Sequence, residues 1–484
     1  MSKIVWNLNN FTGWEADNAR QWPQGSFRYW EWVDVRRQPW EVSLSKALVD
    51  TTWTFTDTIL YIDNIDKYGW SWIVVACNDW KVYLNWTLKQ TISTWTNAHN
   101  RIIGMAYMNV SWADYLYYIT QTSSWGWEIH RSTMDLATWS IWHISFTANS
   151  WAWNTTGKAP TVSEATRFIF GIWWRVFNVD NAEVLTTKLT LSAIEDVLWI
   201  TVFQNQYRVY TNQENELTNQ YFWDWTSTDY NYKTEWVGIP LQAVVNDWWY
   251  DYTIAWDTLS SDFYQIAWTQ RQEIRVNNID WARAFDKHIS TRQWLMYLSW
   301  SLTRVPWIPI YWVYVYGSFY PWYPKAMILE HPISSNNILW HTHIAQSSYF
   351  ACQDDKVYKV GYATNTYNTT WYIQTLKYDW WTWNAYIKKQ IDYAYIGFDN
   401  LNASRTIKIY AIKNGWTPAS EVLLKTLDGT HFGLNWVRID RTEFQALWLW
   451  DFFDLEYRIV LTWTTSSSPV FRWIETYITT WIQR

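Results

Sequence analysis

Tryptophan outnumbers glycine in this chain, which contains 47 Trp and only 14 Gly among its 484 residues. Glycine alone ordinarily makes up about 7% of a protein. Many of the tryptophans stand where turn chemistry calls for glycine, because type I′ and type II turns need a positive φ that a bulky aromatic residue avoids. Examples are Asn78-Asp79-Trp80, Asn246-Asp247-Trp248-Trp249, Asp379-Trp380-Trp381 and Gln38-Pro39-Trp40, and Trp416 in the turn Lys413-Asn414-Gly415-Trp416 is a further suspect position.

This pattern predicts that most of these tryptophans are glycines in the protein that the cell makes. Some genetic codes read UGA as glycine, and a translation table that assigns UGA to tryptophan would then produce this sequence. Some tryptophans are genuine in this interpretation: in Phe222-Trp223-Asp224-Trp225, only Trp225 takes the place of a turn glycine. The alternative is a truly Trp-rich chain that binds sugars.

Charge and composition argue against several classes of protein. The net charge is −6, from 38 basic and 44 acidic residues, without a block of five like charges, so direct nucleic-acid binding is not indicated. Residues 1–10 lack the pattern of a signal peptide, and no apolar stretch is long enough to span a bilayer, so we expect a soluble, non-exported protein. Two cysteines, Cys77 and Cys352, are too few for a disulfide framework and are expected to be buried free thiols.

The distribution of apolar residues predicts an all-β protein. Helical periodicity is scarce, whereas apolar and polar residues alternate in short runs that end at Asn, Asp, Ser, Thr or a suspect Trp. Alternation with abundant Tyr, Phe, Thr, Val and Ile is typical of β-strands. The length suits two or three domains.

A hairpin signature recurs along most of the chain: a turn, then a polar residue, a β-branched residue, and an aromatic residue or His. The clear copies are Trp80-Lys81-Val82-Tyr83, Trp127-Glu128-Ile129-His130, Trp174-Arg175-Val176-Phe177 and Asp355-Lys356-Val357-Tyr358, and weaker ones contain Val209, Phe263 and Val313. The markers from Val82 to Val357 lie about 46 residues apart on average, which suits one four-stranded propeller blade per repeat. We therefore predict a seven-bladed β-propeller over residues 41–368.

Two further features bear on this ring. Cys77 and Cys352 each lie five residues before a marker, which puts them at equivalent positions in neighbouring blades. Such positions are too far apart for a disulfide, so no bridge is expected. Residues 42–48 have strand character and are expected to close the ring by pairing with the last blade.

The repeat ends near residue 370, and strands with a different spacing follow. They are expected at 372–378, 391–398, 405–412, 422–427, 435–439, 457–462 and 470–480. This number of strands, with turns such as Asp428-Gly429-Thr430, predicts an antiparallel β-sandwich with a jelly-roll-like arrangement. The predicted domains are an N-terminal arm (1–40), the propeller (41–368) and the sandwich (369–484), joined at 364–370.

Three stretches carry a resemblance to a known class of proteins. They are residues 32–40 (Trp-Val-Asp-Val-Arg-Arg-Gln-Pro-Trp), the propeller hairpins, and the C-terminal part from Trp371-Tyr372-Ile373-Gln374-Thr375 to Ser467-Ser468-Pro469-Val470. With glycine at the suspect positions, they resemble virion proteins of tailed phages that combine a propeller with a β-sandwich, such as tail hub and nozzle proteins. The resemblance covers nearly the whole chain through diffuse strand and turn patterns. It implies an oligomer, expected to be a homo-oligomer, fitted between other virion proteins.

Each candidate chemical site has a plainer structural explanation. His341 and His343 have the spacing of a metal-ligand pair, but no third ligand is identifiable, so we expect an odd surface pair. Residues 132–139 approach the Asp-box turn, which stabilises a hairpin and catalyses nothing. The densest acidic stretch is expected to be a solvated loop face; its members are Asp224, Asp229, Glu235, Asp247 and Asp251. We therefore predict no catalytic, cofactor or metal site, and no cofactor.

The predicted function is structural. We expect a phage virion protein of the tail or head–tail region, assembled in the host cytoplasm, which acts as a rigid protein-docking module and not as an enzyme. The alternative is a carbohydrate-binding or polysaccharide-degrading tail protein that contacts a host-surface glycan. A host-encoded propeller scaffold is a third possibility, which gene neighbourhood would distinguish. Genuine exposed tryptophans would favour the carbohydrate-binding alternative, and glycine at those positions would favour the structural role.

Overall fold

The computed structural model describes most of the chain. The described residues are 2–8, 27–31, 33–34, 41–65, 72–77, 81–91, 101–121, 126–136, 139–147, 159–203, 206–213, 217–236, 241–247, 250–256, 261–267, 270–274, 282–283, 289–292, 295–305, 308–317, 326–333, 338–361, 370–375, 389–413, 421–449, 451–463 and 467–480. Strands account for nearly all of the regular structure in these residues, as the alternation predicts, and they form antiparallel sheets. The protein is therefore all-β.

Most strands form sheets of four or five that follow one another along the chain. The first three sheets are β6 (Ile59–Ile65), β7 (Trp72–Cys77), β8 (Lys81–Leu84) and β9 (Thr87–Thr91); β10 (Arg101–Val110), β11 (Ala113–Gln121), β12 (Gly126–Thr133) and β13 (Trp139–Thr147); and β14 (Thr161–Ser163), β15 (Arg167–Ile172), β16 (Arg175–Asp180) and β17 (Leu185–Thr190). The next two are β18 (Glu195–Phe203), β19 (Gln206–Gln213), β20 (Thr218–Trp223) and β21 (Tyr232–Trp236); and β22 (Leu241–Asp247), β23 (Tyr250–Trp256), β24 (Ser261–Ala267) and β25 (Gln270–Ile274).

Two more sheets complete this series. One contains β26 (Ala282–Arg283), β27 (Ile289–Arg292), β28 (Leu295–Val305), β29 (Ile308–Gly317) and β30 (Ala326–Ile333). The other contains β31 (Ile338–Ile344), β32 (Ser347–Cys352), β33 (Lys356–Gly361) and β5 (Leu48–Thr54). Its fourth strand therefore comes from the N-terminal part of the chain.

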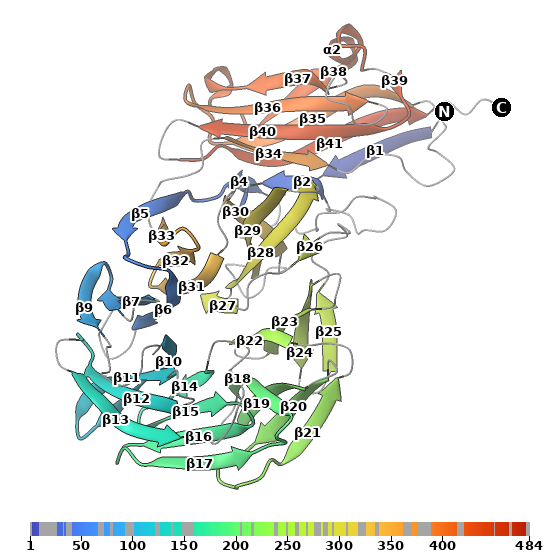
Figure 1. Ribbon diagram of the computed structural model, residues 1–484. Coiled ribbons are helices and arrows are strands. Elements are labelled where there is room, and N and C mark those ends of the chain that lie inside the picture. Colours follow the sequence, from blue (N-terminus) through green and yellow to red (C-terminus); the bar gives the residue numbers. More distant parts are fainter. Residues whose placement is uncertain are drawn as a thin grey trace.

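Contacts between the inner strands arrange these sheets in a closed circuit (Figure 1). In order, the contacting strands are β6, β10, β14, β18, β22, β27 and β31, and β31 contacts β6 again. Apolar clusters fill the spaces between neighbouring sheets, such as the one that joins Val75 of β7 to Ala351 of β32. Buried side chains thus link each sheet to the next.

Two further sheets combine strands from both ends of the chain. The first contains β1 (Ser2–Leu8), β3 (Val33–Asp34), β4 (Val42–Leu44), β35 (Lys389–Asp399), β38 (Trp436–Asp440), β39 (Asp451–Phe452) and β41 (Val470–Thr480). The second contains β2 (Phe27–Glu31), β34 (Thr370–Thr375), β36 (Arg405–Lys413), β37 (Glu421–Leu427) and β40 (Leu455–Trp463). A 3₁₀ turn, η2 (Gly429–His431), precedes β38, and one short helix, α2 (Arg441–Ala446), follows it.

The C-terminal strands lie close to where the alternation predicts them. For example, β36 and β37 each differ from their predicted bounds by one residue at one end, and β41 matches its predicted bounds. The pairings of the N-terminal strands were not predicted: β1 pairs with β41 over its whole length, and β2 pairs with β34. Strands from residues 1–40 therefore complete both C-terminal sheets.

The closing strand differs from the one predicted over residues 42–48. Most of that range belongs elsewhere, because β4 pairs with β41 of the C-terminal sheet. The strand that pairs with β33 is the next one, β5, which shares only Leu48 with the predicted range. β4 is only three residues long (Val-Ser-Leu) and β5 (Leu-Val-Asp-Thr-Thr-Trp-Thr) does not alternate strictly, so the pattern alone does not choose between two available edges.

The repeat markers occupy equivalent strands with one exception. Six of them lie in the third strand of their sheets, for instance Val82 in β8, Val176 in β16 and Val357 in β33. Val209 lies in β19, the second strand, which explains the uneven spacing around it. Cys77 and Cys352 each end a second strand and are buried, as predicted, and neither forms a disulfide bond.

Among the residues that the structure describes, four tryptophans have a left-handed backbone conformation: Trp112 (φ 74°), Trp173 (φ 51°), Trp225 (φ 71°) and Trp448 (φ 58°). Trp225 is the position expected to need a glycine. Trp112 is 99% exposed in the two-residue turn between β10 and β11, so its side chain gains almost no burial there. The expected turn positions at Trp80, Trp248, Trp381, Trp40 and Trp416, and the junction at 364–369, lie outside the described residues.

In a protein that has tryptophan at position 112, as the sequence gives it, we expect Trp112→Gly to raise the free energy of unfolding by about 1 kcal/mol. The reason is that a non-glycine residue in the left-handed region costs about 1–2 kcal/mol. Denaturant unfolding of the two chains measures this difference. Trp86→Gly is the matched control, because Trp86 is also exposed in a two-residue hairpin loop but is not among the residues with positive φ. Equal effects of the two substitutions would contradict the role of φ.

Candidate functional site

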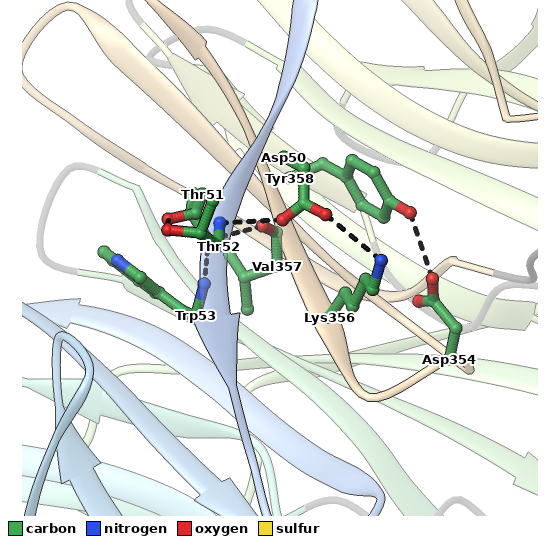
Figure 2. Close-up of polar contacts among 8 residues, drawn as sticks. All are labelled: Asp50, Thr51, Thr52, Trp53, Asp354, Lys356, Val357 and Tyr358. Carbon is green, nitrogen blue, oxygen red and sulfur yellow. Dashed lines mark hydrogen bonds and ion pairs between the residues drawn. The ribbon is translucent and has the colours of Figure 1, made fainter.

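The seam between β5 and β33 joins residues about 300 positions apart and closes the circuit of sheets. Figure 2 shows the side chains of Asp50 and Lys356 pointing toward each other across it, with 3.2 Å between the carboxylate and ammonium groups. Thr51 Oγ1 donates a hydrogen bond of 2.6 Å to the carbonyl of Val357. Side-chain hydrogen bonds therefore supplement the backbone pairing of this strand.

The same seam contains an irregular turn of the backbone. Thr52 has φ of 62°, and its N–H donates to Asp50 Oδ1 at 2.7 Å. The pairing register shifts between Lys356 and Tyr358 opposite it. Trp53, which follows, stacks on Tyr349 with 5.6 Å between ring centroids. The irregularity thus interrupts the pairing with β33 between Asp50 and Thr54, and Trp53 packs on an aromatic ring next to this interruption.

Hydrogen bonding and burial set the ionisation of the acidic and phenolic groups at the seam. The pKa of Asp50 is lowered, first by the N–H of Thr52 and then by the Lys356 ammonium group. Burial raises the pKa of Tyr358 to about 12, and its hydroxyl donates to the Asp354 carboxylate. Asp50 is therefore ionised and Tyr358 neutral near pH 7.

We expect Asp50→Asn to lower stability by less than about 1 kcal/mol, because the ion pair is largely exposed. The folded-state pKa is lowered, so the contribution is present above the unfolded pKa of about 3.9 and is lost as the pH falls through the lower folded value. Thermal unfolding from pH 6 to pH 2 should show the wild-type advantage shrinking at the acidic end. An advantage that grows on acidification would contradict this assignment.

A buried ion pair connects two neighbouring sheets. The Arg208 guanidinium of β19 lies 2.7 Å from the Asp251 carboxylate of β23, and the two side chains are 1% and 0% exposed. Asn246 donates to the other carboxylate oxygen at 2.8 Å, and the Tyr210 hydroxyl also donates to Asp251. Burial raises the pKa of Tyr210 well above its usual value, so it remains a donor. The sheets are thus joined by a charged network as well as by apolar packing.

Glu195 forms a second buried acidic centre, within the sheet of β18 to β21. Its carboxylate accepts hydrogen bonds from Thr211 at 2.6 Å, Gln213 at 2.8 Å and the Tyr221 hydroxyl at 2.7 Å. Burial raises the pKa of Tyr221, with a further contribution from Glu195. Because donors from β19 and β20 surround the carboxylate of Glu195 on β18, this residue is suited to holding the three strands together.

Two of the sequence-based interpretations were wrong about burial. His341 and His343, expected at the surface, are 0% and 8% exposed, and His343 Nδ1 lies 2.7 Å from the Ser348 hydroxyl. Asp251, expected on a solvated loop, is the buried partner of Arg208. In both cases an adjacent sheet covers strand residues whose polarity suggested exposure.

Other candidate residues lie in local structural roles. Asp224 is half-buried, and its pKa is lowered to about 2 by hydrogen bonds, first from Asn231 and then from the backbone of Ser227. In the Asp-box-like turn, Thr133 donates to Asp135 at 2.6 Å while Leu136 is buried. The side chain of Asp247 lies outside the described residues. These contacts organise turns, as expected for the Asp-box-like segment.

Across the described residues, no three or more His, Cys, Asp and Glu side chains gather as they would around a metal ion. Nor does any described helix have the length and apolar character needed to cross a membrane.

The outer face of one C-terminal sheet carries a cluster of aromatic rings. Tyr393 stacks on Tyr477 with 4.4 Å between centroids, and Tyr395 meets Trp436 edge-on at 5.5 Å. The Arg438 guanidinium lies 4.7 Å from the centroid of Tyr393. These side chains alternate with buried residues of the same strands, so they point away from the core.

Comparison with known proteins gives only distant structural likeness. No protein-family model and no curated protein sequence matches the chain. Raptor from Chaetomium thermophilum is 10% identical with a TM-score of 0.44, over 66% of this chain and 29% of Raptor. The Pan2 WD40 domain from Neurospora crassa is 9% identical with a TM-score of 0.39, over 69% of this chain and 98% of that domain. A chain of the mitotic checkpoint complex is 10% identical with a TM-score of 0.41, over 66% of this chain and 95% of that chain. These scores are too low to support a functional argument.

Proposed function

We propose that this protein is a structural component of a tailed-phage virion, located in the tail or head–tail region, which docks other proteins and catalyses no reaction. Residues 41–368 would form a seven-bladed β-propeller and residues 369–484 a β-sandwich, with strands of the 1–40 arm added to the sandwich. The protein would be a homo-oligomer that assembles with other virion proteins in the host cytoplasm.

The observation that best supports this proposal is the closed circuit of sheets and its connection to the C-terminal sheets. One apolar cluster includes Tyr252, Phe263 and Tyr316 from the circuit together with Ile396 and Ile459 from the C-terminal sheets. Such a continuous core favours a rigid body that presents loops on a fixed frame, which suits docking between large partners. The resemblance of the sequence to phage virion proteins supplies the biological setting.

Fractionation of purified particles tests the proposal. We expect the protein at a fixed number of copies per virion, and no release of reducing sugar when the isolated chain is incubated with host polysaccharide. A known depolymerase serves as the positive control for the sugar assay. Absence from particles would contradict the structural role, and sugar release that a single carboxylate substitution abolishes would favour the degrading alternative.

We also propose that most suspect tryptophans are glycine in the native protein. The four described tryptophans at positive φ support this, because each of them lies in a turn or a bend, and glycine is unstrained in that conformation. The intact mass of native protein should fall well below 58.6 kDa, with glycine at 80 and 112 in peptide spectra. Tryptophan confirmed at 80, 112, 248 and 416 would contradict the proposal.

Carbohydrate binding is the second candidate function, and the aromatic outer face is the feature that favours it. Half-exposed tyrosines beside Arg438 offer stacking surfaces and hydrogen-bond donors, a combination that sugar sites also use. A glycan array with the native chain and a Tyr395→Ala variant tests this candidate. Binding that the substitution removes would support carbohydrate binding. An array without signal would exclude the immobilised glycans as ligands.

A further inference from the structure

We propose that residues 42–54 form a strap that couples closure of the sheet circuit to the integrity of the C-terminal sheets. Two strands in this segment belong to different bodies: β4 pairs with β41, and β5 pairs with β33. Only three residues, Ser45, Lys46 and Ala47, separate them. Such a connection spans at most about 10 Å, so neither β4 nor β5 can move far from its sheet without pulling on the other strand.

The strap contributes to three apolar clusters. Val42 and Leu44 belong to the large cluster of the C-terminal sheets, and both are at most 1% exposed. Leu48 packs against the cluster that contains Tyr297 and Val360. Trp53 packs against the cluster between the first and last sheets of the circuit. Displacing the strap would therefore expose apolar surface in both bodies at once.

The connection between the two strands is itself fixed in place. Ser45 and Lys46 are 0% and 5% exposed, so they do not form a slack linker. The N–H of Leu44 donates to Ser468 Oγ at 2.8 Å, just before β41 begins. Figure 1 agrees, since β4 lies beside the C-terminal sheets and β5 lies at the adjoining edge of the circuit.

The β5 half of the strap is the weaker half. No residue of β5 is fully buried, whereas five of the six residues of β32, in the same sheet, are. β5 also contains Thr52 at positive φ, a conformation that costs about 1–2 kcal/mol outside glycine. Strands with few buried contacts are the first to open in the native state. Release of β5 would therefore be the event that loosens the C-terminal sheets.

Hydrogen exchange on the full-length chain tests the coupling. In Leu48→Asp, amides of β33 and also of β41 should exchange at least about tenfold faster than in the wild type. The matched control is Leu185→Asp, since Leu185 also begins the outer strand of a four-stranded sheet and is partly buried against an apolar cluster. It should accelerate exchange in β16 and leave β41 unchanged.

The reverse experiment uses the other end of the strap. Val42→Asp should accelerate exchange in β33 as well as in β41. If either aspartate variant fails to fold, Thr51→Val is the milder replacement, because it removes only the hydrogen bond to Val357. Faster exchange in β33 with β41 unchanged, in Leu48→Asp or Thr51→Val, would overturn the proposal. That result would not contradict the proposed docking function, because the fractionation of virions tests that function separately.

Discussion

Replacing Asp251 by Ala should lower the free energy of unfolding by about 3–5 kcal/mol, as expected when one partner of a buried ion pair is removed. The substitution leaves the Arg208 guanidinium, 1% exposed, without its carboxylate, and it removes the acceptor of Tyr210 and Asn246. Chemical denaturation followed by tryptophan fluorescence and by circular dichroism measures the loss.

A double variant separates the cost of leaving one buried charge uncompensated from the net contribution of the ion pair to the free energy of unfolding. Arg208→Met with Asp251→Leu removes both charges and keeps the volume, so it should be more stable than Asp251→Ala alone. Lys356→Met is the exposed control, because its ion pair with Asp50 is largely in solvent, and it should cost less than about 1 kcal/mol. A loss below 1 kcal/mol for Asp251→Ala would show that the network contributes little.

Deleting residues 1–40 should destabilise the C-terminal sheets more than any single substitution in them. The deletion removes β1 and β3 from one sheet and β2 from the other, and it leaves one edge of β41 and one of β34 unpaired where those strands lay. Unpaired edges of this length promote aggregation. We expect fast exchange of the 470–480 and 370–375 amides in the truncated chain and a marked loss of soluble protein.

Two controls sharpen this prediction. Val5→Pro interrupts the pairing of β1 alone and should have an intermediate effect that is confined to β41. A peptide of residues 1–40 added to the truncated chain should restore protection of both strands, because the pairing sites remain. A truncated chain with unchanged exchange and solubility would show that the C-terminal strands fold without the arm.

Local pattern determined the all-β class and the positions of most strands. In strands such as β36 and β41, alternation of apolar and polar residues marks which face is buried, and that information is present in a few consecutive residues. Repeated turns set the rhythm of the sheets up to Val357. The suspect tryptophans were identified in the same local way, since a turn residue must satisfy its own φ.

Only the tertiary structure decided which edges pair and which polar groups are buried. β4 and β5 follow each other closely in the sequence, yet one pairs with β41 and the other with β33, because an edge is chosen by what lies beside it in space. Asp251 and His343 are as polar as any loop residue, and they are buried because a neighbouring sheet covers each of them, with Arg208 as the partner of Asp251 and the ring of Tyr297 against His343. Burial of a charge depends on that distant partner, which lies 43 residues away in the sequence.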